Sequence, residues 1–252
     1  MLYVLAVNMQ KGGVGKTTTA AVLAQAAQHK GRRVLALDLD PQANLTFALR
    51  ADERQPGTFE LITGKAPAAN LVQHCGGIDV IPASQALPTL TTERGSALRL
   101  RSALQSIAGN YDFIVIDTPT AEGELLYNAL CASSGLLIPT EASVYAVKDI
   151  YQLKKTAERM RKANEQLQIL GYVLTRIDTR SIIARTMQEH LQKVGIDCAG
   201  QIRTSAAIQE AAAKQQSLYE YAPKSNAALD YMALYERITE RGAIIWQNTQ
   251  NT

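Results

Sequence analysis

The stretch Met9-Gln-Lys-Gly-Gly-Val-Gly-Lys-Thr-Thr18 follows a short apolar run and precedes an alanine-rich segment with helical periodicity. Its glycines allow a tight turn with N–H groups pointing inward, and the start of the helix adds the positive end of a dipole. In such a phosphate-binding loop Lys16 reaches the β- and γ-phosphates, and the Thr17 hydroxyl ligates Mg²⁺. The usual first glycine is replaced by Gln10. The motif predicts nucleotide binding by Gly12, Gly13, Val14, Gly15, Lys16, Thr17 and Thr18.

Around this loop, short apolar runs alternate with longer helical patterns, which predicts a single α/β domain over residues 1–252. Most runs are apolar throughout, as expected for a mostly parallel, twisted central sheet with helices on both faces. Strands are predicted at Leu2–Val7, Arg33–Leu37, Ile78–Ile81, Phe113–Ile116, Leu136–Pro139 and Ile169–Leu174. Helices are predicted at Lys16–His29, Gln85–Ala108, Gly123–Ser133, Val147–Asn164, Ile182–Val194, Ala206–Gln215 and Ser225–Trp246, with a short one near Phe59–Thr63.

Two other strand ends carry carboxylates. Side chains alternate along a strand, so Asp38 and Asp40 lie on the same side of the second strand's end. The carboxyl ends of strands border the ligand crevice of an α/β sheet, where a carboxylate orients or deprotonates an attacking water. Asp117 follows four apolar residues, a pattern in which a buried strand delivers a carboxylate to Mg²⁺. We therefore expect Asp117 to join Thr17 at a magnesium site.

Lys11-Gly-Gly-Val-Gly-Lys-Thr-Thr18 resembles the deviant Walker A motif of the ParA/MinD ATPases. In that family the early lysine reaches across an ATP-sandwiched dimer to the partner's nucleotide, a catalytic role that the resemblance gives to Lys11 beside Lys16. Leu37-Asp-Leu-Asp-Pro-Gln42 resembles the family's switch I, in which the second aspartate is catalytic. This likeness implies water activation by Asp40 and a supporting role for Asp38 around Mg²⁺.

The resemblance continues along the chain. Thr118-Pro119 is similar to switch II, with Thr120 in place of the usual second proline. The stretch Gly171–Asp178 looks like the strand after which the family forms its base pocket, which implies ATP contacts by Thr175 and Arg176. Residues 221–231 resemble the C-terminal stretch that leads into the last helix, with Ser225 as its N-cap.

Composition narrows the class of protein. The 252 residues are 46% hydrophobic with a net charge of +3, which excludes disorder as the main state. Three widely spaced cysteines argue against a disulfide framework and favour a reducing cytoplasm. No apolar run approaches the ~20 residues that a membrane helix needs. The sequence opens on the first strand, so we expect no N-terminal helix-turn-helix domain.

The positive charge is concentrated in one part of the chain. Residues 148–215 carry 12 basic and 7 acidic side chains, whereas the remainder is nearly neutral. A basic surface binds nucleic-acid phosphates without sequence preference and in a salt-sensitive way. DNA contacts are predicted for Lys154, Lys155, Arg159, Lys162, Arg180, Arg185 and Arg203. ParA relatives have a further arginine downstream, but here that position is Ala207, so the contacts are expected to be rearranged.

The resemblance is closest to ParA/Soj-like DNA partition ATPases. It implies an ATP- and Mg²⁺-driven homodimer that binds double-stranded DNA non-specifically. Hydrolysis, stimulated by a ParB-like centromere-binding protein, would release the DNA. A cytoplasmic, nucleoid-associated location without stable membrane association follows. The cargo stays open, since a plasmid, a chromosome, a mobile element and a protein assembly would all need the same ATPase.

Other functions stay open at this stage. A MinD-type positioning ATPase binds membrane through a C-terminal amphipathic helix, but residues 236–252 have no basic face after Arg241. A relative of nitrogenase iron protein needs paired cysteines at the dimer axis, for which Cys131 is the candidate. A small-molecule kinase is disfavoured by Lys11 and by Asp-Leu-Asp-Pro.

Overall fold

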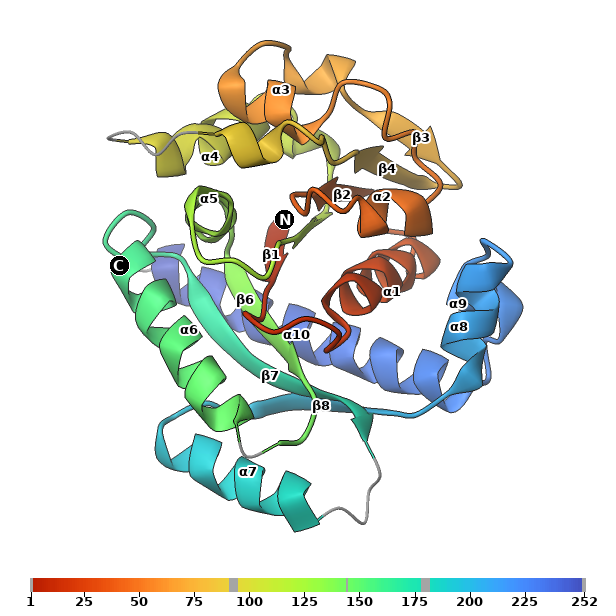
Figure 1. Ribbon diagram of the computed structural model, residues 1–252, viewed down its shortest axis with the longest axis vertical. Helices are drawn as coiled ribbons and strands as arrows, with labels where there is room; N and C mark the ends of the chain where they lie inside the picture. The colour runs from red at the N-terminus through yellow and green to blue at the C-terminus, as the bar shows by residue number, and fades with distance from the viewer. Residues whose placement is uncertain (1, 91–94, 144, 178–181, 251–252) are drawn as a thin grey trace.

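The computed structural model describes residues 2–90, 95–143, 145–177 and 182–250, and within them eight strands form one sheet (Figure 1). The order is β3-β4-β2-β5-β1-β6-β7-β8. All neighbouring pairs are parallel except the edge pair β3–β4. The strands are β1 (Tyr3–Val7), β2 (Val34–Asp38), β3 (Gln73–Cys75), β4 (Ile78–Ile81), β5 (Phe113–Asp117), β6 (Gly135–Thr140), β7 (Gln168–Ile177) and β8 (Cys198–Arg203).

Helices connect the strands and cover the sheet (Figure 1). The α-helices of the described residues are α1 (Lys16–His29), α2 (Asn44–Ala48), α3 (Thr58–Thr63), α4 (Arg99–Leu104), α5 (Glu124–Ala132), α6 (Ala146–Met160), α7 (Ile182–Lys193), α8 (Ala206–Ala213), α9 (Leu218–Tyr221) and α10 (Asn226–Gln250). Short 3₁₀ turns occupy Ala68–Asn70, Leu87–Thr89, Ser96–Leu98 and Ala108–Asn110. None of the helices in this described part is long and apolar enough to span a membrane.

Two hydrophobic cores lie on opposite faces of the sheet because strand side chains alternate. Val4 and Ala6 of β1 pack into the core covered by α3, α4, α5, α6 and α7. Leu5 and Val7 pack into the other core, under α1, α2, α8, α9 and α10. Both faces of the central strands are therefore buried, which explains their continuous apolar sequences. The predicted fold class is confirmed.

Most predicted elements exist with boundaries shifted by a few residues, but the helix predicted over Gln85–Ala108 is wrong. Instead of one helix, the described part holds separate short turns and α4. Pro88 lies in the first turn, where it lacks the N–H that a helix interior needs. Gly95 has a φ of +84°, outside the helical region. The strands β3 and β8 and the short helices α2 and α9 were not predicted.

Ser225 lies at the start of a helix, and the three cysteines are free thiols. Ser225 precedes α10, and its Oγ accepts the backbone N–H of Ala228 at 3.3 Å, as an N-cap does. Cys75, Cys131 and Cys198 are unpaired thiols, and Cys131 is buried within α5. A buried thiol of this kind behaves as a small core side chain.

Candidate nucleotide-binding site

The phosphate loop joins the central strand β1 to α1. Gly13 and Gly15 have φ values of +75° and +86°, which side chains other than glycine rarely adopt. A Cβ added at Gly15 would also contact the Thr175 side chain at 3.5 Å. Lys16 begins α1, and its Nζ donates to the Lys11 carbonyl oxygen at 3.2 Å. The loop is therefore a closed turn with the Lys16 ammonium folded over it.

Strand order brings the predicted carboxylates to this loop. Because β5 lies between β1 and β2, Asp117 is paired in register with Val7 on one side and Asp38 on the other. Burial raises the pKa of Asp38 and of Asp117, and the charge of Asp38 raises that of Asp117 further. Burial lowers the pKa of Lys16, a shift that Asp117 and Asp40 oppose. These groups thus share one partly desolvated electrostatic environment.

The two buried carboxylates differ in their partners. Asp38 Oδ1 accepts the Asp40 N–H at 3.0 Å, and its Oδ2 accepts the N–H and the hydroxyl of Thr46, both at 2.8 Å. Asp117 Oδ1 accepts the Thr118 N–H at 3.2 Å, and the nearby Thr17 hydroxyl lowers the pKa of this carboxyl, but the buried Oδ2 has no hydrogen-bond partner within the described residues. A buried unpaired carboxylate oxygen is costly unless something else satisfies it.

This arrangement fits a magnesium ion. Mg²⁺ prefers oxygen ligands and is commonly held by one or two carboxylates together with substrate phosphates. The free Asp117 oxygen and the neighbouring Thr17 hydroxyl are such ligands, and a cation there would favour the ionised carboxylates. Both oxygens of Asp38 accept hydrogen bonds from the protein, and these bonds hold the Asp40 backbone and Thr46 of α2 in place.

A cavity of about 450 Å³ opens beside the loop, a size in the range of small-molecule sites. Its polar lining includes Gly12, Lys16, Thr17, Asp40 and Thr120. Its apolar lining includes three side chains of α8, namely Ile208, Ala211 and Ala212. The polar lining suits phosphates, and the apolar lining suits a flat heterocycle.

The end of β7 supports the phosphate loop from the outside. The Thr175 hydroxyl donates to the Val14 carbonyl at 2.9 Å, and Arg176 Nη1 donates to the Gly13 carbonyl at 3.0 Å. Arg176 also pairs with Glu141 at 2.6 Å and lines the cavity. The structure therefore brings both residues to the predicted site, although their hydrogen bonds go to the loop backbone.

Lys11 and Asp40 occupy different positions around the cavity. Asp40 is half-buried, lines the cavity, and accepts the Gln42 N–H at 3.0 Å. Lys11 is exposed and does not line the cavity of the described chain, although the adjacent Gly12 does. Its ammonium is thus available to a site other than the nucleotide pocket of its own chain.

Sequence reasoning missed Asn8, the residue between β1 and the phosphate loop. Its amide Nδ2 donates to the Thr118 hydroxyl at 2.6 Å and to the Pro119 carbonyl at 3.0 Å. Thr118 in turn donates to the Val7 carbonyl at 2.8 Å. Asn8 therefore ties the β5–α5 loop, residues 118–123, to the start of the phosphate loop. A buried polar residue ending an apolar strand was the available signal.

The predicted DNA contacts separate into two groups. Lys155, Lys162 and Arg185 are exposed on α6, after it and on α7. Of these, the Lys155 ammonium lies over the Tyr151 ring at 4.6 Å. The others have hydrogen-bonded or ion-pair partners: Lys154 donates to the Val194 carbonyl at 2.7 Å, Arg159 pairs with Glu122, and Arg203 makes a bidentate pair with Asp230. Arg180 lies outside the described residues.

Comparison with known proteins places this chain in a family. The family model described as an AAA domain matches residues 2–169. The chain is 32% identical to the sporulation initiation inhibitor protein Soj of Bacillus subtilis, over 95% of the chain and 99% of that protein. It is 34% identical to the chromosome-partitioning ATPase Soj of Thermus thermophilus, over 94% and 95% of the two chains.

Solved structures agree with these relatives in fold. The apo structure of the Cyanothece protein McdA matches with a TM-score of 0.83 at 25% identity, over 95% and 99% of the two chains. Cobyrinic acid a,c-diamide synthase of Mycobacterium smegmatis, with ADP and magnesium, matches with 0.78 at 28% identity, over 94% and 93%. MinD of Pyrococcus horikoshii, with Mg-ADP, matches with 0.80 at 23% identity, over 97% and 99%. The chain therefore belongs to the ParA/MinD family of P-loop ATPases.

Proposed function

We propose that this ATPase is a DNA partition protein whose ATP-bound homodimer holds double-stranded DNA without sequence preference. A ParB-like partner would stimulate hydrolysis and so release the DNA. The observation that carries the proposal is the 34% identity, over nearly the whole of both chains, to a relative named as a chromosome-partitioning ATPase. The likeness to MinD, at 23% identity, supports the fold alone, so a membrane-surface role is not favoured.

As a member of this family the chain hydrolyses ATP with Mg²⁺ as the metal cofactor. We assign the phosphates to the loop from Gly12 to Thr18 and to Lys16, whose charge compensates theirs. Thr17 and Asp117 are the proposed magnesium ligands, with Asp38 in support. When bound, the metal neutralises charge on the phosphates. Asp40, at the cavity wall, orients the attacking water and accepts its proton.

Lys11 is assigned to the partner's nucleotide in a closed dimer. Its side chain is exposed, and its own cavity is lined by the glycines that follow it. A second positive charge arriving from another chain would stabilise the developing charge on the phosphates only after dimerisation. This arrangement links hydrolysis to the assembled state.

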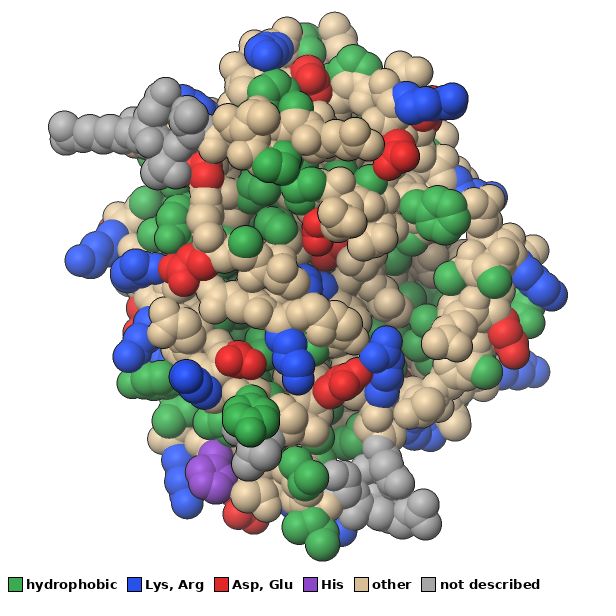
Figure 2. All heavy atoms as spheres, viewed as in Figure 1, with side chains coloured by type: hydrophobic (Ala, Val, Ile, Leu, Met, Phe, Trp, Pro, Cys, Tyr) green, Lys and Arg blue, Asp and Glu red, His purple; other side chains and the backbone are tan. Residues whose placement is uncertain are grey.

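The proposed DNA surface lies over α6 and α7. Figure 2 shows Lys and Arg side chains gathered over α6, with acidic side chains among them. Lys155, Lys162 and Arg185 are among the exposed cations of this surface, and a homodimer would present it twice. Two surfaces on one DNA raise the effective affinity without any new contact.

The test compares three states of the purified protein: with ADP, with ATP, and Asp40→Ala with ATP. Gel filtration should show a dimer only with ATP, and most persistently for the variant. DNA retention at low salt should follow the dimer, and liposomes of anionic lipid should retain none of the states. DNA retention that is equal with ADP and ATP, or ATP-dependent liposome binding, contradicts the partition role.

A further inference from the structure

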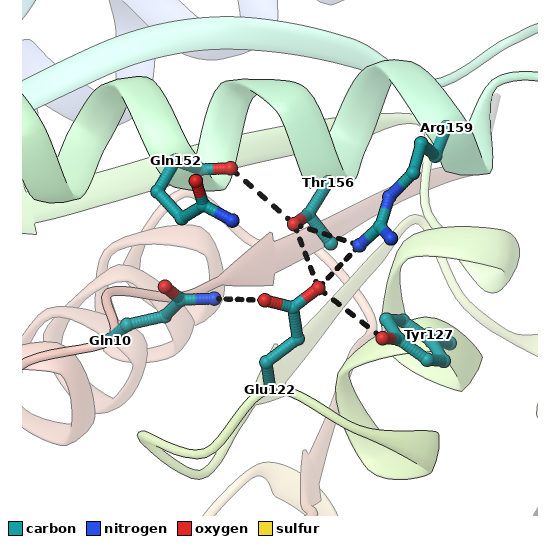
Figure 3. Close-up of polar contacts among 6 residues, drawn as sticks. All are labelled: Gln10, Glu122, Tyr127, Gln152, Thr156 and Arg159. Atoms are coloured by element: carbon teal, nitrogen blue, oxygen red, sulfur yellow. Dashed lines mark hydrogen bonds and ion pairs between the residues drawn. The ribbon is translucent and has the colours of Figure 1, made fainter.

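The Glu122 carboxylate of the β5–α5 loop contacts the phosphate loop, α5 and α6. Glu122 Oε2 accepts the Gln10 amide of the phosphate loop at 3.3 Å (Figure 3). Its Oε1 accepts the Tyr127 hydroxyl of α5 at 3.2 Å and the Thr156 hydroxyl of α6 at 3.0 Å. Arg159 of α6 completes the cluster through an ion pair with Oε1. No other feature of the loop connects it to α6 in this way within the described residues.

The contacts match the chemistry of an ionised carboxylate. Such a group only accepts hydrogen bonds, and bonds to it are stronger than those between neutral groups. Partial burial raises the pKa of Glu122, but the bonds from Thr156, Arg159, Gln10 and Tyr127 outweigh that effect and leave its pKa below the usual value. Its side chain is 29% exposed, so the ion pair is partly shielded from water. The cluster therefore favours one position of the charged side chain.

The loop that Glu122 holds has little other support. Within the described part of the chain, no backbone–backbone hydrogen bond involves residues 119–122. The first half of the loop is held by the Asn8 amide, and the second half by Glu122. Asn8 and Gln10 flank Met9, where the chain enters the phosphate loop, so both tethers begin at the start of that loop.

The same loop begins at the magnesium side of the site. Asp117 ends β5 directly before it, and Thr120 lines the nucleotide cavity. A shift of the loop therefore moves groups that face the phosphates. Misplacement of reacting groups by about 1 Å can lower a rate by about 100-fold.

We propose that Glu122 is a positioning residue for ATP hydrolysis: its carboxylate fixes the β5–α5 loop between the phosphate loop and α6, with Arg159 as its charge partner. Thr156 has the complementary role of a buried anchor, because its side chain is fully enclosed and its hydroxyl meets both groups. The sequence pattern gave no reason to single out Glu122, because the cluster exists only after the fold brings four segments together.

The test measures kcat and KM for ATP in the full-length protein with Mg²⁺ and no DNA. Glu122→Ala should lower kcat by about tenfold while KM changes little, because the phosphate loop itself is intact. Glu122→Gln, which keeps the shape and one acceptor oxygen, should restore part of the loss. Glu165→Gln is the matched acid-to-amide control on an exposed site outside the cluster and should leave kcat unchanged.

A double-mutant cycle separates positioning from general destabilisation. Arg159→Gln should lower kcat in the same direction, and combining it with Glu122→Ala should add little, because both changes break one contact. Thermal melting reports folding of each variant, and Glu122→Gln keeps the test decisive if the alanine variant does not fold. Values of kcat within twofold of the native chain for both folded Glu122 variants, or fully additive losses, overturn the proposal.

The Glu122–Arg159 ion pair also joins the β5–α5 loop to the surface proposed for DNA. An effect of DNA on this ion pair rests on the proposed function. A DNA phosphate that attracts Arg159 competes with Glu122, so DNA and hydrolysis should be coupled. Saturating duplex DNA should shift kcat of the native protein, and the shift should shrink in Arg159→Gln. If no DNA is retained at all, the partition role fails, while the DNA-free kinetics still decide the role of Glu122.

Discussion

The phosphate loop and the basic surface of α6 and α7 are built on different principles. The loop is defined by backbone shape, with glycines at positive φ and a helix start beneath it, so its residues have one geometry. The basic surface is defined by side chains whose charges other side chains partly neutralise, such as Arg159 by Glu122. A sequence motif therefore locates the phosphate loop directly. A count of basic residues, in contrast, overstates the number of cations that the surface of α6 and α7 offers to DNA.

The largest expected effect tests the loop. Lys16→Ala should weaken ATP binding by at least about 100-fold, because the ammonium that compensates the phosphates is lost. Titration calorimetry with ATP and Mg²⁺ measures this change. Lys30→Ala removes an exposed lysine at the other end of α1, paired with Glu236, and should bind ATP as the native chain does. Near-native affinity of Lys16→Ala would contradict the assignment.

Asp40 should separate binding from chemistry. Asp40→Ala should bind ATP and dimerise but lose about 100-fold in kcat, the lower end of the range for removal of a general base. Phosphate release and gel filtration of the same samples give both quantities. Asp52→Ala, in an exposed loop where Asp52 pairs with Arg54, is the control. Normal hydrolysis by Asp40→Ala would move the base to another residue.

Arg203 tests whether a basic residue predicted to contact DNA has a structural role instead. Its guanidinium makes two bonds to Asp230 at 2.6 and 2.9 Å, joining the end of β8 to α10. Arg203→Ala should lower the free energy of unfolding only modestly, since the pair is partly exposed and screened by solvent. Urea unfolding measures this loss. Arg54→Ala, in a largely exposed pair with Asp52, should change stability far less.

The smallest expected effect is on DNA binding by the exposed residues Lys162 and Arg185. Lys162→Ala should leave stability unchanged and reduce by about 1 the slope of log affinity for DNA against log salt. Arg185→Ala should reduce the slope by a similar amount, and for both variants the reduction should not depend on the DNA sequence. Fluorescence anisotropy with duplex DNA at several salt concentrations gives the slopes. An unchanged slope in both variants would place the DNA surface elsewhere.

The sequence predicted best where local chemistry decides the structure. Helix α1 was predicted with its observed bounds, Lys16–His29, because a glycine loop precedes it and apolar residues fill it. Strand β8 was missed because Cys198–Arg203 is half polar and edge-like, and its strand state depends on pairing with β7. The row formed by Val7, Asp38 and Asp117 needed the strand order, which periodicity does not contain.

The same limit applied within the site. Lys16, Thr17 and Asp40 were recognisable from spacing, since each belongs to a short motif at a strand end. Asn8 and Glu122 were not, because apart from Tyr127 their hydrogen-bond partners lie more than 30 residues away in sequence. Long-range side-chain clusters of this kind become visible only in the folded chain.

The central place of β1 has a consequence for synthesis on the ribosome. Tyr3 pairs with Phe113 and Leu5 with Gly135, so the strand that carries the phosphate loop is made well before either of its neighbours in the sheet. At typical elongation rates the intervening residues take on the order of ten seconds to emerge. During that time an apolar strand has no native partner, and contacts this distant slow folding. We expect this ATPase to depend on protection of the nascent strand β1 until β5 and β6 have been made.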